Sequence, residues 1–206
     1  MIMQKEGNIF IISAASGTGK TTLVSRLVQG QPDIRVSVSH TTRAPRGAEQ
    51  NGVHYHFVDN PEFTHLIKEN AFLEHALVFG NHYGTSYAAI DSLTQKGINV
   101  ILEIDVQGAA QVRKHLPEAC SIFILPPSMS VLANRLQNRG TDNSEVIQTR
   151  LQEACREIEQ AHFFDYAVIN GDLDKAEQDL LHIIRARGLK QTRQHHFIKQ
   201  LLANAS

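Results

Sequence analysis

Residues 16–21 read Ser-Gly-Thr-Gly-Lys-Thr, a combination of small, basic and hydroxyl side chains that can bind phosphate. An apolar run at 9–12 precedes them, and apolar residues at helical spacing follow. Strand, glycine turn and helix form the context of a phosphate-binding loop, where backbone N–H groups converge near the positive end of the helix. In such a loop, Lys20 reaches the β- and γ-phosphates of a nucleotide, and the Thr21 hydroxyl binds Mg²⁺.

The loop departs from the usual pattern at its first position, where Ala14 stands in place of glycine. Alanine disfavours positive φ, so we predict an ordinary backbone conformation at this residue. The alternative to a phosphate site is a plain turn and helix cap. Because Gly-Lys-Thr lies correctly between strand and helix, we expect the nucleotide to contact Ala14, Ala15, Ser16, Gly17, Thr18, Gly19, Lys20, Thr21 and Thr22.

Two arginines, Arg43 and Arg46, flank a proline turn close to Ser39 and other hydroxyl residues. Guanidinium groups on one loop can hold a phosphate through paired hydrogen bonds. Exposed arginines are also common on solvated surface loops, which is the alternative. Tyr55 and Tyr83 lie in the same segment, and their phenols could complete a phosphate cage.

A second basic set consists of Arg135, Arg139 and Arg150. The first two are four residues apart and share one face of an expected helix, and Arg150 lies early in the next helix. A polar link between the helices favours a mobile cap that brings positive charge onto a transferring phosphoryl group. Ordinary helix-surface charge is the alternative.

Three carboxylates stand at positions that suggest a function. Glu103 and Asp105 end an apolar strand, where a carboxylate can hold Mg²⁺ directly or through water; Asp105 might instead cap the next helix. Glu74 lies within an apolar strand, where a carboxylate is costly unless it faces solvent or a partner. The alternation of side chains along the strand places Glu74 on the same side as Phe72 and Ala76, and this side could be a pocket wall or a surface face.

The composition narrows the class of protein. The chain has 206 residues, 42% hydrophobic, with 20 basic and 21 acidic side chains, which fits a globular protein better than a nucleic-acid binder. Two cysteines without metal-ligand spacing favour a reducing cytoplasm, and the sequence shows no signal peptide or membrane-length apolar run. We therefore expect neither nucleic-acid nor membrane partners, and a homo-oligomer is left open.

The element pattern predicts an α/β fold with a doubly wound parallel sheet. Expected core strands at 9–12, 98–104, 120–125 and 166–169 alternate with helices near 108–115, 129–138, 145–162 and 172–188. Expected strands at 34–38, 53–58 and 72–79, with helices from 60 and from 86, indicate a small antiparallel α/β insertion over about residues 36–95. The tail 190–206 is either a packing helix or a frayed end.

Taken together, these motifs resemble the bacterial guanylate kinases, nucleoside-monophosphate kinases of the P-loop NTPase superfamily. The resemblance covers essentially the whole chain. It rests on the phosphate loop and on five further stretches: 38–46, Phe72-Leu73-Glu74-His75, 80–85, 103–108 and 135–140.

The resemblance implies Mg²⁺-dependent phosphoryl transfer from ATP to GMP, with dGMP as a further acceptor. It implies a core domain (1–35, 96–126 and 160–206), a small mixed α/β GMP-binding insertion (36–95) and a helical lid (127–159). Arg135, Arg139 and Asn170 would contact ATP, with Lys20, Arg43, Arg139 and Arg150 as the catalytic cations. GMP would be bound by Ser39, Arg43, Arg46, Tyr55, Glu74, Tyr83, Thr85 and Asp105.

Two other functions compete. One is a related P-loop kinase of another phosphorylated acceptor, such as a ribose bisphosphate, which would not need Glu74 in a guanine pocket. The other is a non-catalytic guanylate-kinase-like module that binds protein partners, although Lys20, Thr21, Arg139 and Arg150 argue against a lost active site.

Overall fold

The computed structural model describes residues 6–78, 80–138 and 144–203. Its centre is a five-stranded sheet of order β2-β7-β1-β8-β9, in which every pair of neighbouring strands is parallel. The strands are β1 (Ile9–Ala14), β2 (Ile34–Val36), β7 (Asn99–Glu103), β8 (Cys120–Leu125) and β9 (Tyr166–Ile169). The predicted doubly wound α/β fold is therefore confirmed.

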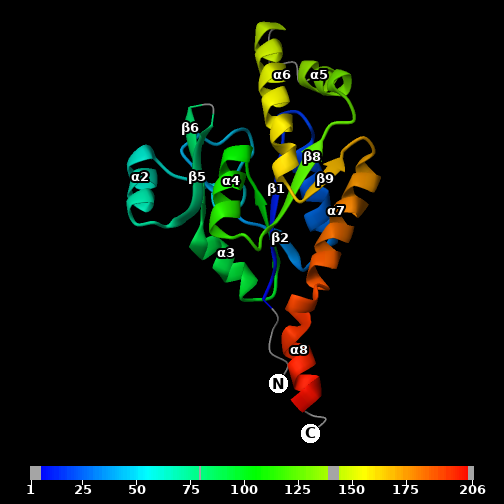
Figure 1. Ribbon diagram of the computed structural model, residues 1–206. Helices are drawn as coiled ribbons and strands as arrows, with labels where there is room; N and C mark the ends of the chain where they lie inside the picture. Colours follow the sequence, from blue (N-terminus) through cyan, green and yellow to red (C-terminus); the bar gives the residue numbers. More distant parts are fainter. Residues whose placement is uncertain (1–5, 79, 139–143, 204–206) are drawn as a thin grey trace.

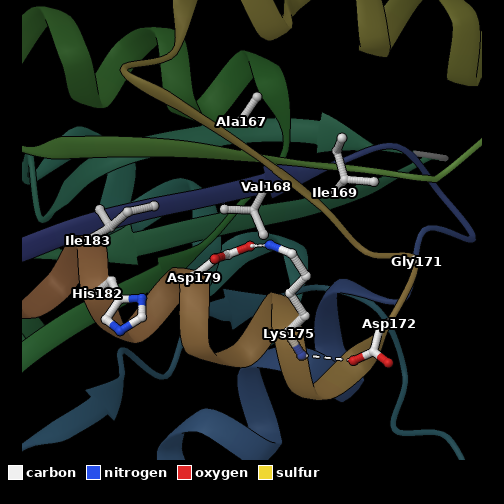
Figure 2. Close-up of a pocket in the computed structure, with 9 residues that line it drawn as sticks. All are labelled: Ala167, Val168, Ile169, Gly171, Asp172, Lys175, Asp179, His182 and Ile183. Atoms are coloured by element: carbon white, nitrogen blue, oxygen red, sulfur yellow. Dashed lines mark hydrogen bonds and ion pairs between the residues drawn. The ribbon is translucent and has the colours of Figure 1, made fainter.

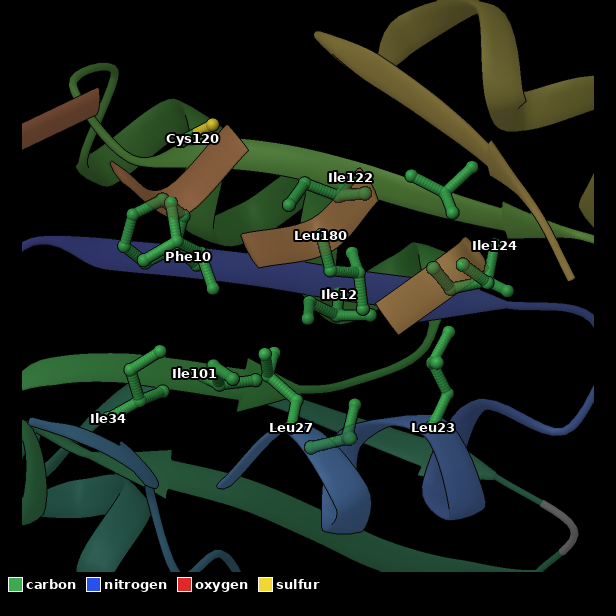
Figure 3. Close-up of a cluster of buried hydrophobic side chains, with 14 residues drawn as sticks. Phe10, Ile12, Leu23, Leu27, Ile34, Ile101, Cys120, Ile122, Ile124 and Leu180 are labelled. Atoms are coloured by element: carbon green, nitrogen blue, oxygen red, sulfur yellow. The ribbon is translucent and has the colours of Figure 1, made fainter. Parts of the chain in front are cut away.

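Helices cover both faces of this sheet (Figure 1). On one face, α1 (Lys20–Gly30) and α7 (Leu173–Gly188) pack against β1 and β8; Figure 3 shows Leu23, Leu27 and Leu180 around Ile12 and Ile122. On the other face, α3 (Tyr87–Thr94) and α4 (Val106–His115) pack around Ile11. Strands buried on both faces explain the nearly continuous apolar runs in the sequence.

The insertion forms a second sheet of order β4-β3-β6-β5. The prediction of an antiparallel insertion is wrong for one pair, because β3 pairs in parallel with β4, whereas β6 is antiparallel to both β3 and β5. The strands of this sheet are β3 (His40–Thr41), β4 (His56–Phe57), β5 (Phe72–Val78) and β6 (Asn81–Ser86), and α2 (Asn60–Lys68) covers it. Phe63 of α2 stacks on Phe72 with ring centroids 4.7 Å apart. Leu73 of β5 reaches the core cluster that also holds α3, so the two sheets are joined by packing.

The expected strands at 53–58 and 34–38 are both shorter than predicted. Residues 52–54 form a turn in which the N–H of Gln50 donates to His54 Nδ1 at 3.0 Å, and only β4 pairs in the sheet. Strand β2 ends at Val36, although the next N–H, that of Ser37, still donates to the Ile101 carbonyl at 2.9 Å. Alternation of side chains does not reveal where a neighbouring strand ends.

At the carboxyl end of β8 stand two helices, α5 (Met129–Gln137) and α6 (Ser144–Glu159) (Figure 1). The short helix η1 (Gln160–Phe163) follows them. Leu132, Leu136 and Ala154 of these helices form a small apolar cluster with Ala15. The phosphate loop is thus part of the packing surface of the expected lid.

The tail is a helix, α8 (Gln191–Ala203), that extends beyond the sheet (Figure 1), and Arg193 Nη2 donates to the Gly7 carbonyl at 3.4 Å. Its apolar stripe stays exposed, with Phe197 at 61% and Leu202 at 66% of their full accessible surface. Among the described residues, no helix is both long enough and apolar enough to span a membrane.

Candidate active site

The loop between β1 and α1 has the backbone that a phosphate site requires. Gly17 and Gly19 have φ of 86° and 95°, and Ala14 is not among the described residues with positive φ, as predicted. A Cβ on Gly19 would lie 2.8 Å from Asn170 Nδ2, and one on Gly17 would lie 2.8 Å from Leu136. Both glycines are therefore required by conformation and by space.

The loop is held from outside by two residues expected to contact ATP. The Thr18 carbonyl accepts from Asn170 Nδ2 at 2.8 Å and from Arg135 Nη1 at 2.9 Å. Arg135 Nη2 also donates to the Asn170 carbonyl at 3.1 Å. In the structure, these side chains support the nucleotide loop, whatever further contact they make with ATP.

The cationic end of the loop faces carboxylates. Thr21 Oγ1 donates to Glu103 Oε1 at 2.5 Å, and Lys20 Nζ lies 3.9 Å from the same oxygen. Burial lowers the pKa of Lys20, while nearby Glu103, Asp105 and Glu157 oppose that effect and favour its charged form.

Two cavities meet at Lys20. A cavity of about 270 Å³ is lined by the phosphate loop, and one of about 340 Å³ is lined by the insertion and the end of β7. Ser16, Lys20, Thr21 and Asp105 line both. This arrangement suits two ligands whose reacting ends face one another across a lysine.

A larger cavity of about 570 Å³ lies elsewhere, between β9 and α7 (Figure 2). Its lysine, Lys175, is paired with Asp179 at 2.9 Å, and the apolar side chains of Val168, Ile169 and Ile183 form much of the wall. Size alone does not identify the reactive site, because this cavity is not lined by the glycine loop that a phosphate site requires.

At the cavity of about 340 Å³, the residues predicted to surround a purine base lie together. Glu74 is only 3% exposed, and its Oε1 accepts from Thr85 Oγ1 at 2.5 Å. The Thr85 hydroxyl is in turn 3.3 Å from Ser39 Oγ. Burial raises the pKa of Glu74 to about 7, the Thr85 hydrogen bond opposes this shift, and nearby Asp105 adds to it.

Arg43 lies between a carboxylate and aromatic rings. Its Nη2 is 2.9 Å from Glu49 Oε1, and its guanidinium carbon is 5.4 Å from the centre of the Tyr55 ring. The Tyr55 and Tyr83 rings are 5.9 Å apart. The Arg46 N–H donates to Glu49 Oε2 at 2.7 Å, while the Arg46 side chain is exposed. Of the four residues predicted to hold a phosphate, Arg43, Tyr55 and Tyr83 thus lie together, whereas the side chain of Arg46 is exposed.

The structure also decides what Asp105 does locally. Its Oδ1 accepts from the N–H of Gly108 at 2.9 Å, so it caps α4, one of the two roles considered from the sequence. The carboxylate that touches the Thr21 hydroxyl is Glu103. Arg150 is half-buried on α6, and the predicted catalytic Arg139 lies outside the described residues.

Two acidic residues of the site were missed in the sequence. Glu49 pairs with Arg43, and Glu157 of α6 accepts from the Ser16 N–H at 3.3 Å. An acid within the basic loop could have indicated the first. Glu157 is 141 positions from its partner, and nothing local indicates the contact.

A model of the guanylate kinase family matches residues 6–187. The chain belongs to the guanylate kinase family. A guanylate kinase of Neisseria gonorrhoeae is 63% identical over 205 residues, covering 100% of both chains. One of Shewanella violacea is 52% identical over 207 residues, covering 98% of this chain and 100% of the relative. A crystal structure of guanylate kinase from Anaplasma phagocytophilum matches with a TM-score of 0.77 at 34% identity, covering 93% of this chain and 92% of the other.

Proposed function

We propose that this protein transfers the γ-phosphoryl group of ATP to GMP, giving ADP and GDP. The observation that carries the proposal is Glu74, a buried carboxylate in a cavity that shares Lys20 with the phosphate loop. Family membership supports a kinase of GMP over a kinase of a ribose bisphosphate or a non-catalytic module.

The base would be selected by hydrogen bonding. Guanine presents N1–H and N2–H₂ donors on one edge, and an ionised Glu74 can accept from both. Adenine has no such pair of donors and would leave the buried carboxylate without partners, which is costly. Ser39, Thr85 and Asp105 lie around Glu74, and dGMP offers the same base and phosphate.

The phosphate of GMP would lie on Arg43, Arg46, Tyr55 and Tyr83, which directs it toward Lys20. Phosphoryl transfer needs alignment and charge neutralisation rather than a protein nucleophile. We assign that neutralisation to Lys20 and Arg43, assisted by Arg139 and Arg150 of the lid. The division into core, insertion (36–95) and lid (127–159) belongs to this proposal.

The donor set fits Mg²⁺. The Thr21 hydroxyl and the Glu103 carboxylate, 2.5 Å apart, are both oxygen ligands of the kind that Mg²⁺ prefers. Among the described residues, no group of three His, Cys, Asp or Glu side chains could hold a metal, so nucleotide phosphates would complete the coordination. Bound Mg²⁺ supplies positive charge at the β- and γ-phosphates. Asp105 remains a second candidate, acting through water.

The test is ADP production from MgATP with GMP, AMP or ribose 1,5-bisphosphate as acceptor. Of the three acceptors, we expect only GMP to give rapid ADP formation. Faster reaction with ribose bisphosphate would favour the other kinase, and no reaction with any acceptor would favour the binding module. Both cysteines are free, Cys120 buried and Cys155 exposed, which supports the cytoplasm as the place of reaction.

A further inference from the structure

A carboxylate of the expected lid contacts the phosphate loop. Glu157 of α6 lines the 270 Å³ cavity with Lys20, and its Oε2 accepts from the Ser16 N–H at 3.3 Å. Loop N–H groups are what a phosphate-binding loop offers to an anion. Glu157 therefore holds a place that a nucleotide phosphate would otherwise take.

The surroundings do not favour a negative charge at Glu157. Burial raises the pKa of this carboxyl, and the carboxylates of Asp105 and Glu153 add to the rise. The Ser16 hydrogen bond and the charge of Lys20 act the other way. The charged form of Glu157 is thus less favoured in this site than in water.

Helix α6 is also held by apolar packing that does not involve Glu157. Its Ala154 is fully buried against Leu132, Leu136 and Ala15, and the partly buried Ile147, Leu151 and Ile158 extend the same cluster. A neutral side chain at 157 would pack there without the electrostatic cost of a carboxylate. The charge therefore calls for a role other than fastening the helix.

We propose that Glu157 is an internal competitor for nucleotide phosphate, a specificity-determining residue that lowers the affinity of the loop for anions. Two anions cannot share the Ser16 N–H, so an arriving phosphate displaces the carboxylate. A full nucleotide, with its base, ribose and Mg²⁺, offsets this cost, whereas a simple polyphosphate offsets less of it. The proposal rests on the proposed function, because it takes this loop as the ATP site.

Glu157→Gln tests the proposal, because it keeps the shape and an oxygen that can accept from Ser16 while it removes the charge. Binding of inorganic tripolyphosphate and of MgATP would be measured by calorimetry. We expect tripolyphosphate to bind about five- to tenfold more tightly to the variant, and MgATP about two- to threefold more tightly. The KM for ATP should fall while kcat stays within about twofold.

The matched control is Glu153→Gln, which removes the same charge one turn earlier on α6 and leaves the Ser16 contact in place. It should change tripolyphosphate affinity by less than about twofold. Glu157→Ala provides a second variant and should tighten binding in the same direction. Thermal melting would show that each variant is folded.

Unchanged or weaker tripolyphosphate binding in both Glu157 variants would overturn the proposal, as would equal tightening in Glu153→Gln. Because tripolyphosphate binding does not involve GMP, this result is independent of whether the protein phosphorylates GMP. Failure of the kinase assay together with tighter tripolyphosphate binding would reject the proposed function and leave the competitor in place.

Discussion

The phosphate loop and the purine pocket solve different problems with different groups. The loop would bind phosphate through backbone N–H groups of one contiguous segment, and Arg135 and Asn170 hold the loop through the Thr18 carbonyl. The pocket is assembled from side chains of separate strands, with Glu74 at its centre. Backbone groups bind any phosphate and do not titrate, whereas a buried carboxylate discriminates between bases and depends on pH. Under the proposed function, affinity for phosphate and specificity for the base would therefore reside in separate regions.

The largest effect is expected on the loop side, from Lys20→Met. Loss of the ammonium removes positive charge from the phosphates as negative charge develops, and kcat should fall on the order of 10³-fold with the fold intact. Steady-state assays with MgATP and GMP measure this. Lys175→Met, which removes a lysine on α7, is the control and should keep wild-type turnover. Near wild-type activity in Lys20→Met would mean that the loop assignment is wrong.

On the pocket side, Glu74→Gln should separate the two bases. The amide places a donor against the guanine donors, so kcat/KM for GMP should fall by about 2–3 kcal/mol, roughly 30- to 150-fold. AMP makes no such contact, and its low activity should fall far less. Parallel measurements with both nucleotides are needed. Equal losses would make Glu74 a structural residue.

The buried carboxylate of the pocket should make the folded protein less stable at high pH. The backbone N–H groups of the loop do not titrate and add no such dependence. The pKa of Glu74 is raised to about 7 in the folded protein, so between about pH 4.5 and 7 the folded state retains a proton that the unfolded state has lost. The stability contribution of this group is thus present below pH 4.5 and lost as the pH rises through 7.

Glu74→Gln lacks this loss. It should be more stable than wild type by about 3 kcal/mol at pH 8 and by little at pH 4.5. Urea unfolding of both proteins at several pH values measures the difference. Subtracting the two free energies of unfolding cancels the contributions of other titrating groups. One of these is His40, whose pKa burial lowers to about 4. A gap that does not change with pH would contradict the buried carboxylate.

The smallest effect is expected from Arg135→Lys, which tests the support of the loop. A lysine cannot bridge the Thr18 and Asn170 carbonyls as Arg135 does, at 2.9 and 3.1 Å. Stability should fall by about 1 kcal/mol, with weaker ATP binding. Arg156→Lys, on the exposed side of α6, is the matched control. Identical unfolding curves for both variants would remove Arg135 from the support of the loop.

Local sequence predicted the loop better than the pocket. The glycines, the ordinary backbone at Ala14 and the buried strand β8 all follow from neighbouring residues, and the structure confirms them. Strand β9 was expected to be buried like β8, but it lies at the edge of the sheet, and of its four residues only Val168 is buried. The end of the strand near 53–58 does not, because it depends on where β3 offers a partner. Pairings such as Glu157 with Ser16 join distant segments and leave no periodic pattern.

The carboxylates show the same limit. Its place within an apolar strand and the resemblance to guanylate kinases both singled out Glu74, and in the structure it contacts Thr85, whose hydroxyl lies next to Ser39. The strand-end motif did not distinguish Asp105 from Glu103, because a helix cap and a metal ligand draw on the same residue types. Only the fold separates them, with Asp105 on Gly108 and Glu103 on Thr21.

Proton release on GMP binding tests most directly whether guanine is recognised by an ionised Glu74. Calorimetry at pH 6 in two buffers of different ionisation enthalpy counts the protons. Because the pKa of Glu74 is about 7, the wild type should release most of one proton more than Glu74→Gln, which corrects for the GMP phosphate. Equal proton release by the two proteins would contradict the claim.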